Sequence, residues 1–290
     1  MTNKKFSKFR NFCSAAALIA GLGLTGCYFD TQEMRLETAK RIAMPSFMIH
    51  REIRAEPFFL TAYERVHKEH APATIYIEGD GVAWVSRSRP SLDPTPRNPV
   101  ALHLASRDLG PNVIYLARPC QYSGLTVDAP CDAKYWTSDR FSPEVMHAMN
   151  DALDNIKKKY DITEFNLVGF SGGGAVAALL TEERDDVATL RTVAGNLDHV
   201  KLNEMHEVSQ MPNSLNPADN AAKIANIPQH HFIGEWDDVV TPAIFDSFRA
   251  AAGPSSCIRS SMVKRVDHET GWVNIWPTLL KAPLDCNVQH

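Results

Sequence analysis

One serine lies within a short run of glycines at residues 169–173, which read GFSGG and match the pattern Gly-x-Ser-x-Gly. A strand-like apolar run precedes this stretch, and an alanine-rich run follows it. A serine on a very tight strand-to-helix turn takes a strained backbone conformation that lifts its hydroxyl above the sheet. The strand and helix then approach so closely that a Cβ atom at residue 169 or 173 would collide. The pattern predicts that Ser171 is a nucleophile, although a glycine turn that only packs would show the same residues.

A serine hydroxyl is a weak nucleophile near neutral pH, so it needs a general base, and the base needs an orienting acid. Two later stretches supply them: residues 231–240 read HFIGEWDDVV and residues 267–272 read DHETGW. Asp237 and His268 each follow the expected end of a strand. The chain order Ser171, Asp237, His268 is nucleophile, acid, base. It predicts acyl transfer through a covalent serine intermediate, a reaction that needs neither a metal nor an organic cofactor.

These three stretches resemble those of the α/β-hydrolase fold family, and the resemblance extends from about residue 47 to the C-terminus. It implies an α/β fold with a mostly parallel eight-stranded sheet flanked by helices, and a site at the carboxyl ends of the strands. The amide of Gly172, directly after the nucleophile, is one expected donor to the oxyanion. The resemblance places the second donor after the third strand, at Asp80 or Gly81. Many relatives have histidine where this chain has Glu78, so the choice between the two amides stays open.

Other residues compete for these roles or suggest different ones. Glu235 and Asp238 flank Asp237, and Asp198 follows another expected strand end, where some members of the family carry the acid. Arg118 could hold an anionic group of the substrate, but pairing with a nearby carboxylate is the favoured interpretation. Four further histidines are expected to be structural or exposed, and we predict no metal site at them: His67, His70, His230 and His231.

The N-terminal residues have the pattern of a secretory signal. Residues 1–10 carry four basic residues and no acid, and residues 12–24 form an apolar stretch too short to span a membrane. Residues 24–27 read LTGC, which resembles the lipobox of bacterial lipoproteins; an ordinary N-terminal anchor helix is the alternative. The resemblance implies a signal peptide at 1–26, acylation of Cys27, a tether over 27–46 and a hydrolase domain over 47–290. Tyr28 at the next position favours the outer membrane, on the side that faces the periplasm.

The cysteines fit an exported chain. Cys13 lies in the signal and Cys27 takes the lipid, which leaves an even set of four. Four cysteines allow three connectivities. We favour the pairing of sequence neighbours over a metal site because no Cys-x-x-Cys pair occurs. The predicted disulfides are Cys120–Cys131 and Cys257–Cys286.

Charge and length exclude other classes of protein. The chain has 30 basic and 34 acidic residues, and removal of residues 1–26 with their four basic residues leaves 26 against 34, a net charge of −8. No basic block remains that could follow nucleic acid, so no nucleic-acid partner is expected. The remaining 264 residues (290 − 26) fit one large domain. The expected partners are a small acyl substrate and, through the lipid, a membrane.

Strands and helices are expected to alternate along the chain, which implies a mostly parallel sheet covered on both faces, with an antiparallel hairpin at one edge. The expected strands are residues 47–53, 58–66, 74–77, 113–117, 165–168, 188–194, 231–233 and 261–266. Helices are expected from 98 to 110, from 142 onward, and over 174–180, 218–225, 242–252 and 272–281.

The substrate class follows from the space over the site. Only about thirty-five residues separate the strands at 188–194 and 231–233, too few for a large lid domain beside the usual crossover helix. Residues 82–97 and 121–139 are the other segments that could roof the site. An open site favours a small or extended carboxylic ester. Peptidases and thioesterases use the same three residues, and a catalytically silent lipoprotein that only binds is the alternative from another class.

Overall fold

The computed structural model describes residues 33–122 and 130–286 of the chain, so the expected signal peptide and Cys27 lie outside the described residues. The domain is built on an eight-stranded sheet with the order β1-β2-β6-β3-β7-β8-β9-β10. In this sheet β2 alone runs against the other strands. The strands are β1 (Ile49–Ala55), β2 (Phe58–Val66), β3 (Ala73–Ile77), β6 (Asn112–Leu116), β7 (Phe165–Phe170), β8 (Val187–Val193), β9 (Gln229–Gly234) and β10 (Ile258–Val263).

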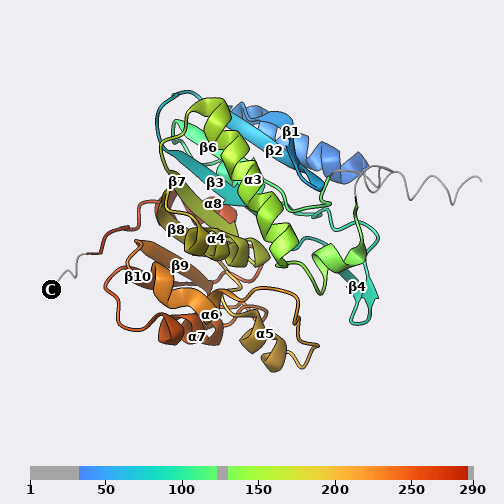
Figure 1. Cartoon of the computed structure of the whole chain (residues 1–290), viewed down its shortest axis with the longest axis vertical. Helices are drawn as coiled ribbons and strands as arrows, with labels where there is room; N and C mark the ends of the chain where they lie inside the picture. Colours follow the sequence, from blue (N-terminus) through green and yellow to red (C-terminus); the bar gives the residue numbers. More distant parts are fainter. Residues whose placement is uncertain (1–32, 123–129, 287–290) are drawn as a thin grey trace, which may run out of the picture.

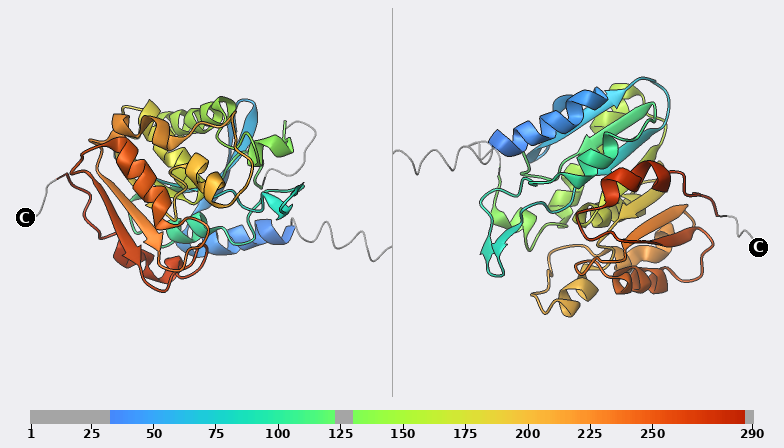
Figure 2. Two further views of the ribbon diagram at one scale, coloured as in Figure 1. Left: turned by 90° about the horizontal axis from the view of Figure 1, so that it is seen from below. Right: turned by 180° about the vertical axis from the view of Figure 1, so that it is seen from behind.

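Helices cover both faces of the sheet (Figures 1 and 2). One apolar layer joins the sheet to α3 (Pro143–Tyr160), α4 (Gly172–Glu183), η3 (Ala221–Ile224) and α7 (Pro242–Ala252). The other layer joins it to a helix over residues 33–43, to α2 (Val100–Ala105) and to α8 (Trp272–Leu279). Shorter elements are η1 (Met44–Ser46), the hairpin β4 (Trp84–Ser86) and β5 (Arg89–Pro90), η2 (Ala133–Trp136), α5 (His199–Met205) and α6 (Pro217–Asn220).

Local sequence explains where the central elements begin. Every residue of β6 is buried, as expected for a parallel strand with helices on both faces. Helix α3 begins at Pro143 because Ser142 caps it, its hydroxyl accepting from the Val145 amide at 3.3 Å. An apolar face of seven buried residues then holds α3 on the sheet: Val145, Met146, Ala148, Met149, Ala152, Leu153 and Ile156.

Several expected boundaries shift in the structure. The last strand was expected at 261–266 but spans Ile258–Val263, because Val266 is buried in a loop rather than in the strand. The first strand begins at Ile49, since Phe47 has a left-handed φ of 57°. Residues 33–43, part of the expected tether, are helical and pack on the domain through buried Ala39 and Ala43. The sequence-based expectations lack the β4–β5 hairpin, α5 and the short helices η1 and η2.

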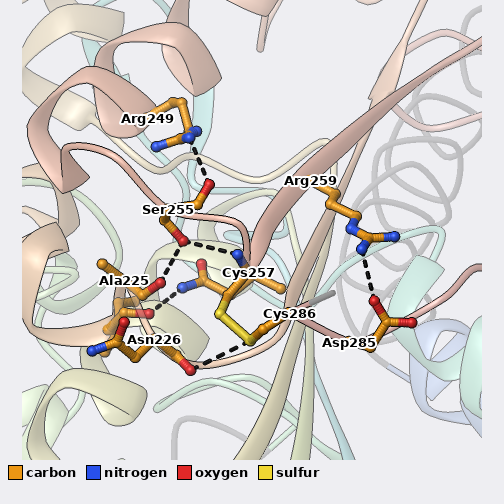
Figure 3. Close-up of a disulfide and its surroundings, with 10 residues drawn as sticks. Ala225, Asn226, Arg249, Ser255, Cys257, Arg259, Asp285 and Cys286 are labelled. Carbon is orange, nitrogen blue, oxygen red and sulfur yellow. Dashed lines mark hydrogen bonds and ion pairs between the residues drawn. A yellow bond between two sulfur atoms is a disulfide. The ribbon is translucent and has the colours of Figure 1, made fainter. Parts of the chain in front are cut away.

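Both predicted disulfides are confirmed, and with them the pairing of sequence neighbours. Cys120 pairs with Cys131, and Cys257 pairs with Cys286 across Cα–Cα separations of 5.6 and 4.0 Å. Figure 3 shows the second disulfide, which fastens the C-terminal segment beside the start of β10, next to an ion pair between Arg259 and Asp285 of 2.7 Å. Among the described residues no helix is long and apolar enough to cross a bilayer.

Candidate active site

Ser171 lies on the turn between β7 and α4, in the strained conformation that the glycine pattern predicts. Its φ is 50° and its ψ is −120°, a region that residues with a side chain rarely adopt. Backbone hydrogen bonds hold the turn: the Ser171 amide donates to Val193 O at 3.0 Å, and the Ser171 carbonyl accepts from the Asn196 amide at 2.9 Å. The neighbouring end of β8 therefore fixes the turn that presents the hydroxyl at the carboxyl edge of the sheet.

Backbone atoms of neighbouring elements lie very close to the glycines on either side of Ser171, as the sequence predicts. A Cβ atom on Gly169 would lie 2.2 Å from the carbonyl oxygen of Gly173, and one on Gly173 would lie 2.3 Å from the carbonyl oxygen of Ile77. Real side chains do not approach backbone this closely, so β3, β7 and α4 can pack in this way only if both positions lack a side chain. The steric prediction for residues 169 and 173 agrees with the structure.

Ser171, His268 and Asp237 form one chain of hydrogen bonds. His268 Nε2 lies 3.0 Å from the Ser171 hydroxyl oxygen, and His268 Nδ1 lies 2.9 Å from Asp237 Oδ2. The Asp237 side chain is fully buried, and its other oxygen accepts from the amides of Val239 at 2.9 Å and Val240 at 2.8 Å. A neutral imidazole that donates Nδ1–H to this carboxylate presents its Nε2 lone pair to the hydroxyl. The arrangement can therefore take up the proton of Ser171.

The loops that carry the acid and the histidine are braced against each other. A Cβ atom on Gly234 would lie 2.7 Å from the carbonyl oxygen of Val266, and the Trp236 amide donates to that same oxygen at 2.9 Å. The indole nitrogen of Trp272 donates to the carbonyls of Asp267 at 3.0 Å and His268 at 3.1 Å. These contacts fix the backbone of the loop that carries His268.

The competing residues have structural contacts instead. Asp198 caps α5 by accepting from the Lys201 amide, and its other oxygen accepts from the Ser247 hydroxyl at 2.5 Å. Glu235 accepts from a backbone amide and is exposed, as is Asp238. His231 is buried in β9, and this burial lowers its pKa to about 3. None of the other predicted histidines reaches Ser171; His230 is mostly buried in β9, and His67 and His70 are exposed.

The loop after β3 carries the expected oxyanion donors. The Gly79 amide donates to the side chain of Glu78 at 2.9 Å, and the Gly79 carbonyl accepts from Gln121 Nε2 at 2.9 Å. Among the described residues the amides of Asp80 and Gly81 have no acceptor. The Gly172 amide stands in the first turn of α4, where helix amides lack an internal partner. Free amides are therefore present on both sides of Ser171.

A cluster of charged side chains supports this loop, with Arg118 buried and Asp80 and Arg140 half-buried. The Asp80 carboxylate lies 3.3 Å from Arg118 Nη1 and 3.0 Å from Arg140 Nη1, and both guanidinium groups stack on the ring of Phe141. Burial lowers the pKa of Arg118 to about 10, with a further contribution from the nearby Arg140. Arg118 thus has the structural role that the sequence favoured. Arg140 was missed, because no local pattern marks it.

Glu78 is buried directly beneath the same loop. Its Oε1 atom accepts from the amides of Gly79 at 2.9 Å and Ala101 at 3.4 Å. Burial raises the pKa of Glu78 to about 7, although these amides act in the opposite direction. The tyrosine at 115 lies beside it and has a pKa well above its usual value for the same reason. The site therefore holds an acid that is partly protonated at neutral pH.

Within the described residues, no group of three or more His, Cys, Asp or Glu side chains is placed to hold a metal ion. Comparison with known proteins gives one family model, described as "Alpha/beta hydrolase of unknown function (DUF915)", which matches residues 140–230. Among curated proteins, no sequence matches this chain.

Solved structures resemble the chain over most of its length. An esterase from Pyrococcus furiosus is 13% identical with a TM-score of 0.58, covering 82% of this chain and 91% of the esterase. Est1E from Butyrivibrio proteoclasticus is 14% identical with a TM-score of 0.55, covering 80% and 96%. A membrane phospholipase A described as a bacterial virulence factor is 12% identical with a TM-score of 0.54, covering 92% and 94%. The sheet order, the nucleophile turn and these likenesses show that the chain has the α/β-hydrolase fold.

Proposed function

We propose that this protein is a serine hydrolase that cleaves carboxylic esters through an acyl-enzyme. The observation that carries the proposal is the continuous chain of hydrogen bonds from Asp237 through His268 to Ser171, which we call the relay. The hydrogen-bonded atoms are 2.9 and 3.0 Å apart. Structural ion pairs between histidine and aspartate are common in proteins. A serine at a strained turn within reach of the far ring nitrogen is instead the arrangement that nucleophilic catalysis requires.

The reaction runs in two halves. The Ser171 hydroxyl oxygen attacks the ester carbonyl carbon while His268 Nε2 takes its proton, and Asp237 holds the resulting imidazolium. The amide of Gly172, with that of Asp80 or Gly81, stabilises the negative charge on the carbonyl oxygen. His268 then gives the proton to the leaving alcohol, which leaves the acyl group on Ser171. Water attacks this acyl group while His268 takes a proton from the water, and the acid departs as the proton returns to the serine oxygen.

An ester is the favoured substrate class because no large lid covers the site. Such a lid would be inserted in the segment between β8 and β9. Between β8 and β9 the chain forms only α5, α6 and η3, all of them short. The similar structures include an esterase and a phospholipase, both of which act on carboxylic esters. Thioesters and amides use the same relay, so they are the alternative substrates on which the enzyme must be compared.

The same proposal places the enzyme in the cell envelope. Two disulfides fit a chain that folds in an oxidising compartment, and residues 1–27 have the pattern of a lipoprotein signal. The lipid would be attached to Cys27. Replacement of Cys27 by Ser should then move the protein from the membrane fraction to the soluble fraction, and an unchanged distribution would contradict the lipid anchor.

Labelling with a fluorophosphonate probe tests the nucleophile directly. The wild-type chain should be labelled, the Ser171→Ala variant should not, and Ser138→Ala, which removes an exposed serine, should be labelled normally. A panel of p-nitrophenyl esters, thioesters and aminoacyl anilides then identifies the bond that is cleaved. Labelling with no activity on any ester would contradict the ester proposal, and no labelling at all would favour a silent binding protein.

A further inference from the structure

The β4–β5 hairpin presents apolar and basic side chains to solvent together. Trp84, Val85 and Leu92 are 45%, 47% and 65% exposed. Arg87 and Arg89 are exposed on the same hairpin and have no acidic partner among the described residues. We call these five residues the hairpin patch. The chain as a whole is acidic, with a net charge of −4, so unpaired arginines beside an exposed tryptophan are a local exception.

The hairpin is firmly attached at its base, so its exposed side chains have a fixed place. The Val82 amide donates to Pro94 O at 3.0 Å, and the Ser91 amide donates to Ala83 O at 2.9 Å. The indole nitrogen of Trp136 donates to Ser91 O at 3.2 Å. The chain reaches this hairpin directly from Gly81 of the oxyanion loop, so the hairpin patch lies on the rim of the site.

Exposed apolar side chains also lie on the opposite rim. Met205, Trp236 and Val239 are 41%, 59% and 40% exposed, and they belong to α5 and to the loop after β9. In the sheet, β3 lies on one side of β7, and β8 and β9 lie on the other. All these loops leave the same carboxyl edge, so the two apolar groups flank Ser171 from opposite sides.

The start of the described chain lies beside the hairpin. Arg35, near the beginning of the helix over 33–43, donates to Asp93 Oδ2 at 3.2 Å and to Thr95 O at 3.0 Å. Figures 1 and 2 show this end of the helix on the same side of the molecule as β4. The 32 residues that precede it include the apolar stretch 12–24, and they join the domain at this point.

We propose that the hairpin patch docks on an anionic phospholipid bilayer, with Trp84, Val85 and Leu92 at the boundary between headgroups and acyl chains. Tryptophan is favoured at this boundary, and arginines near the surface bind lipid phosphates. Arg87 and Arg89 supply those contacts on a protein that is otherwise acidic. The docking turns the open edge of the site toward the lipid. It involves no bond cleavage, so it can be tested apart from the proposed hydrolysis.

The test measures binding of the processed chain, residues 27–290, to vesicles. Every variant carries Ser171→Ala and Cys27→Ser, so that hydrolysis, an attached lipid and the basic and apolar residues 1–26 do not contribute. The anionic probe is a vesicle of phosphatidylcholine with 30% phosphatidylglycerol. A neutral vesicle of phosphatidylcholine alone is the control. The partition constant for the anionic vesicles should fall about 30-fold when Arg87→Gln and Arg89→Gln are combined. Leu92→Ser should also weaken binding. Leu109→Ser should not, because Leu109, which is 94% exposed, lies in the loop before β6 at the amino ends of the strands.

A second measurement reports the position of the hairpin itself. Brominated lipids quench tryptophan fluorescence, and the difference between the parent and Trp84→Phe isolates the quenching of Trp84. The proposal expects strong quenching of this component on anionic vesicles. It is overturned if Trp84 is not quenched, if the arginine variants bind as the parent does, or if Leu109→Ser weakens binding as much as Leu92→Ser.

Discussion

On one side of Ser171 the site consists of short loops whose polar atoms are paired with the backbone. On the other side it consists of charged side chains that are buried or half-buried. We call the loops after β9 and β10 the relay side, and the loop after β3 with its supporting arginines the oxyanion side. On the relay side, both oxygens of the buried Asp237 carboxylate are used, one by His268 and the other by two amides. These hydrogen bonds orient the carboxylate toward the imidazole ring.

The oxyanion side leaves more of its buried atoms unpaired. The Nε atoms of Arg118 and Arg140 have no hydrogen-bond partner among the described residues. Asp80 partly compensates the two arginines, and a Cβ atom on Gly172 would lie 2.1 Å from its carboxylate. Burying charges is unfavourable even when they are paired. The comparison therefore predicts that the relay side controls rate, while the oxyanion side controls how stability depends on pH.

Removal of the Ser171 hydroxyl, the proposed nucleophile, should have the largest effect on rate and little effect on stability. Ser171→Ala and Ser171→Gly should each lower kcat/KM for a p-nitrophenyl ester by at least about 10⁴-fold. Since φ at this position is 50°, glycine should relieve strain that alanine retains, so the glycine variant should be more stable by about 1 kcal/mol. Ester kinetics and urea unfolding measure the two effects. A collapsed melting temperature for Ser171→Ala would show that the hydroxyl is needed for the fold instead.

The contact between the two sides can be broken at Gly173. A Cβ atom there would lie 2.3 Å from Ile77 O and 2.5 Å from Glu78 O, so Gly173→Val should prevent β3 and α4 from packing. The expected result is loss of soluble folded protein. Gly253→Ala is the control, because no atom lies within 4 Å of its added Cβ and only backbone strain of about 1–3 kcal/mol is expected. Circular dichroism of the purified variants distinguishes these results, and a soluble, fully active Gly173→Val would contradict the role of the turn.

The relay side could be anticipated from sequence because each part of it is a local pattern at the end of a strand. The stretches at 169–173, 231–240 and 267–272 each contain their own turn residues, and the structure brings their polar side chains together. The α/β class and the mostly parallel eight-stranded sheet with an antiparallel hairpin at one edge are confirmed, since apolar runs separated by helices leave few other arrangements. Both disulfides were found through the parity and spacing of cysteines.

The oxyanion side could not be anticipated because its contacts join distant parts of the chain. Asp80 meets Arg118 and Arg140, which are 38 and 60 residues away, and nothing near any of them in sequence indicates the pairing. The hairpin β4–β5 and α5 are too short and too exposed to give a periodic pattern. The boundary of β10 was also misplaced because of a tertiary contact. Val266 is buried in the loop after the strand, and the sequence pattern alone cannot tell a buried loop residue from a buried strand residue.

Glu78 should make stability depend on pH. Its pKa is about 7 in the folded state and 4.5 as its ordinary value, so between these pH values the folded state binds more protons than the unfolded state. The free energy of unfolding should therefore fall as pH rises from about 4.5 to 7. Glu78→Gln should remove this contribution and be more stable than wild type at pH 8 by up to about 3 kcal/mol. Urea unfolding at pH 4 and pH 8 measures the difference.

A second buried acid provides the control for this measurement. The pKa of Glu182 is raised to about 8 by burial, and this residue lies on α4 away from the oxyanion loop. Glu182 is unchanged in the Glu78→Gln variant. The free energy of unfolding of this variant should therefore still fall as pH rises, but less steeply than that of the wild type. Identical slopes for wild type and Glu78→Gln would mean that Glu78 is ionised in the folded protein.

The smallest expected effect comes from Trp272. It shows whether the hydrogen bonds of this side chain position His268 for catalysis or only stabilise the fold. Trp272→Phe removes the two hydrogen bonds to the carbonyls of Asp267 and His268, whereas Trp276→Phe removes one bond to the Tyr76 hydroxyl at 3.1 Å. Both tryptophans are fully buried in α8, so each change should destabilise the fold by about 1 kcal/mol. Only Trp272→Phe frees the histidine loop, so only this variant should also lower kcat, by about tenfold. Equal kcat values for the two variants would show that the loop is held without Trp272, and that the relay side owes its geometry to Gly234 and Val266 instead.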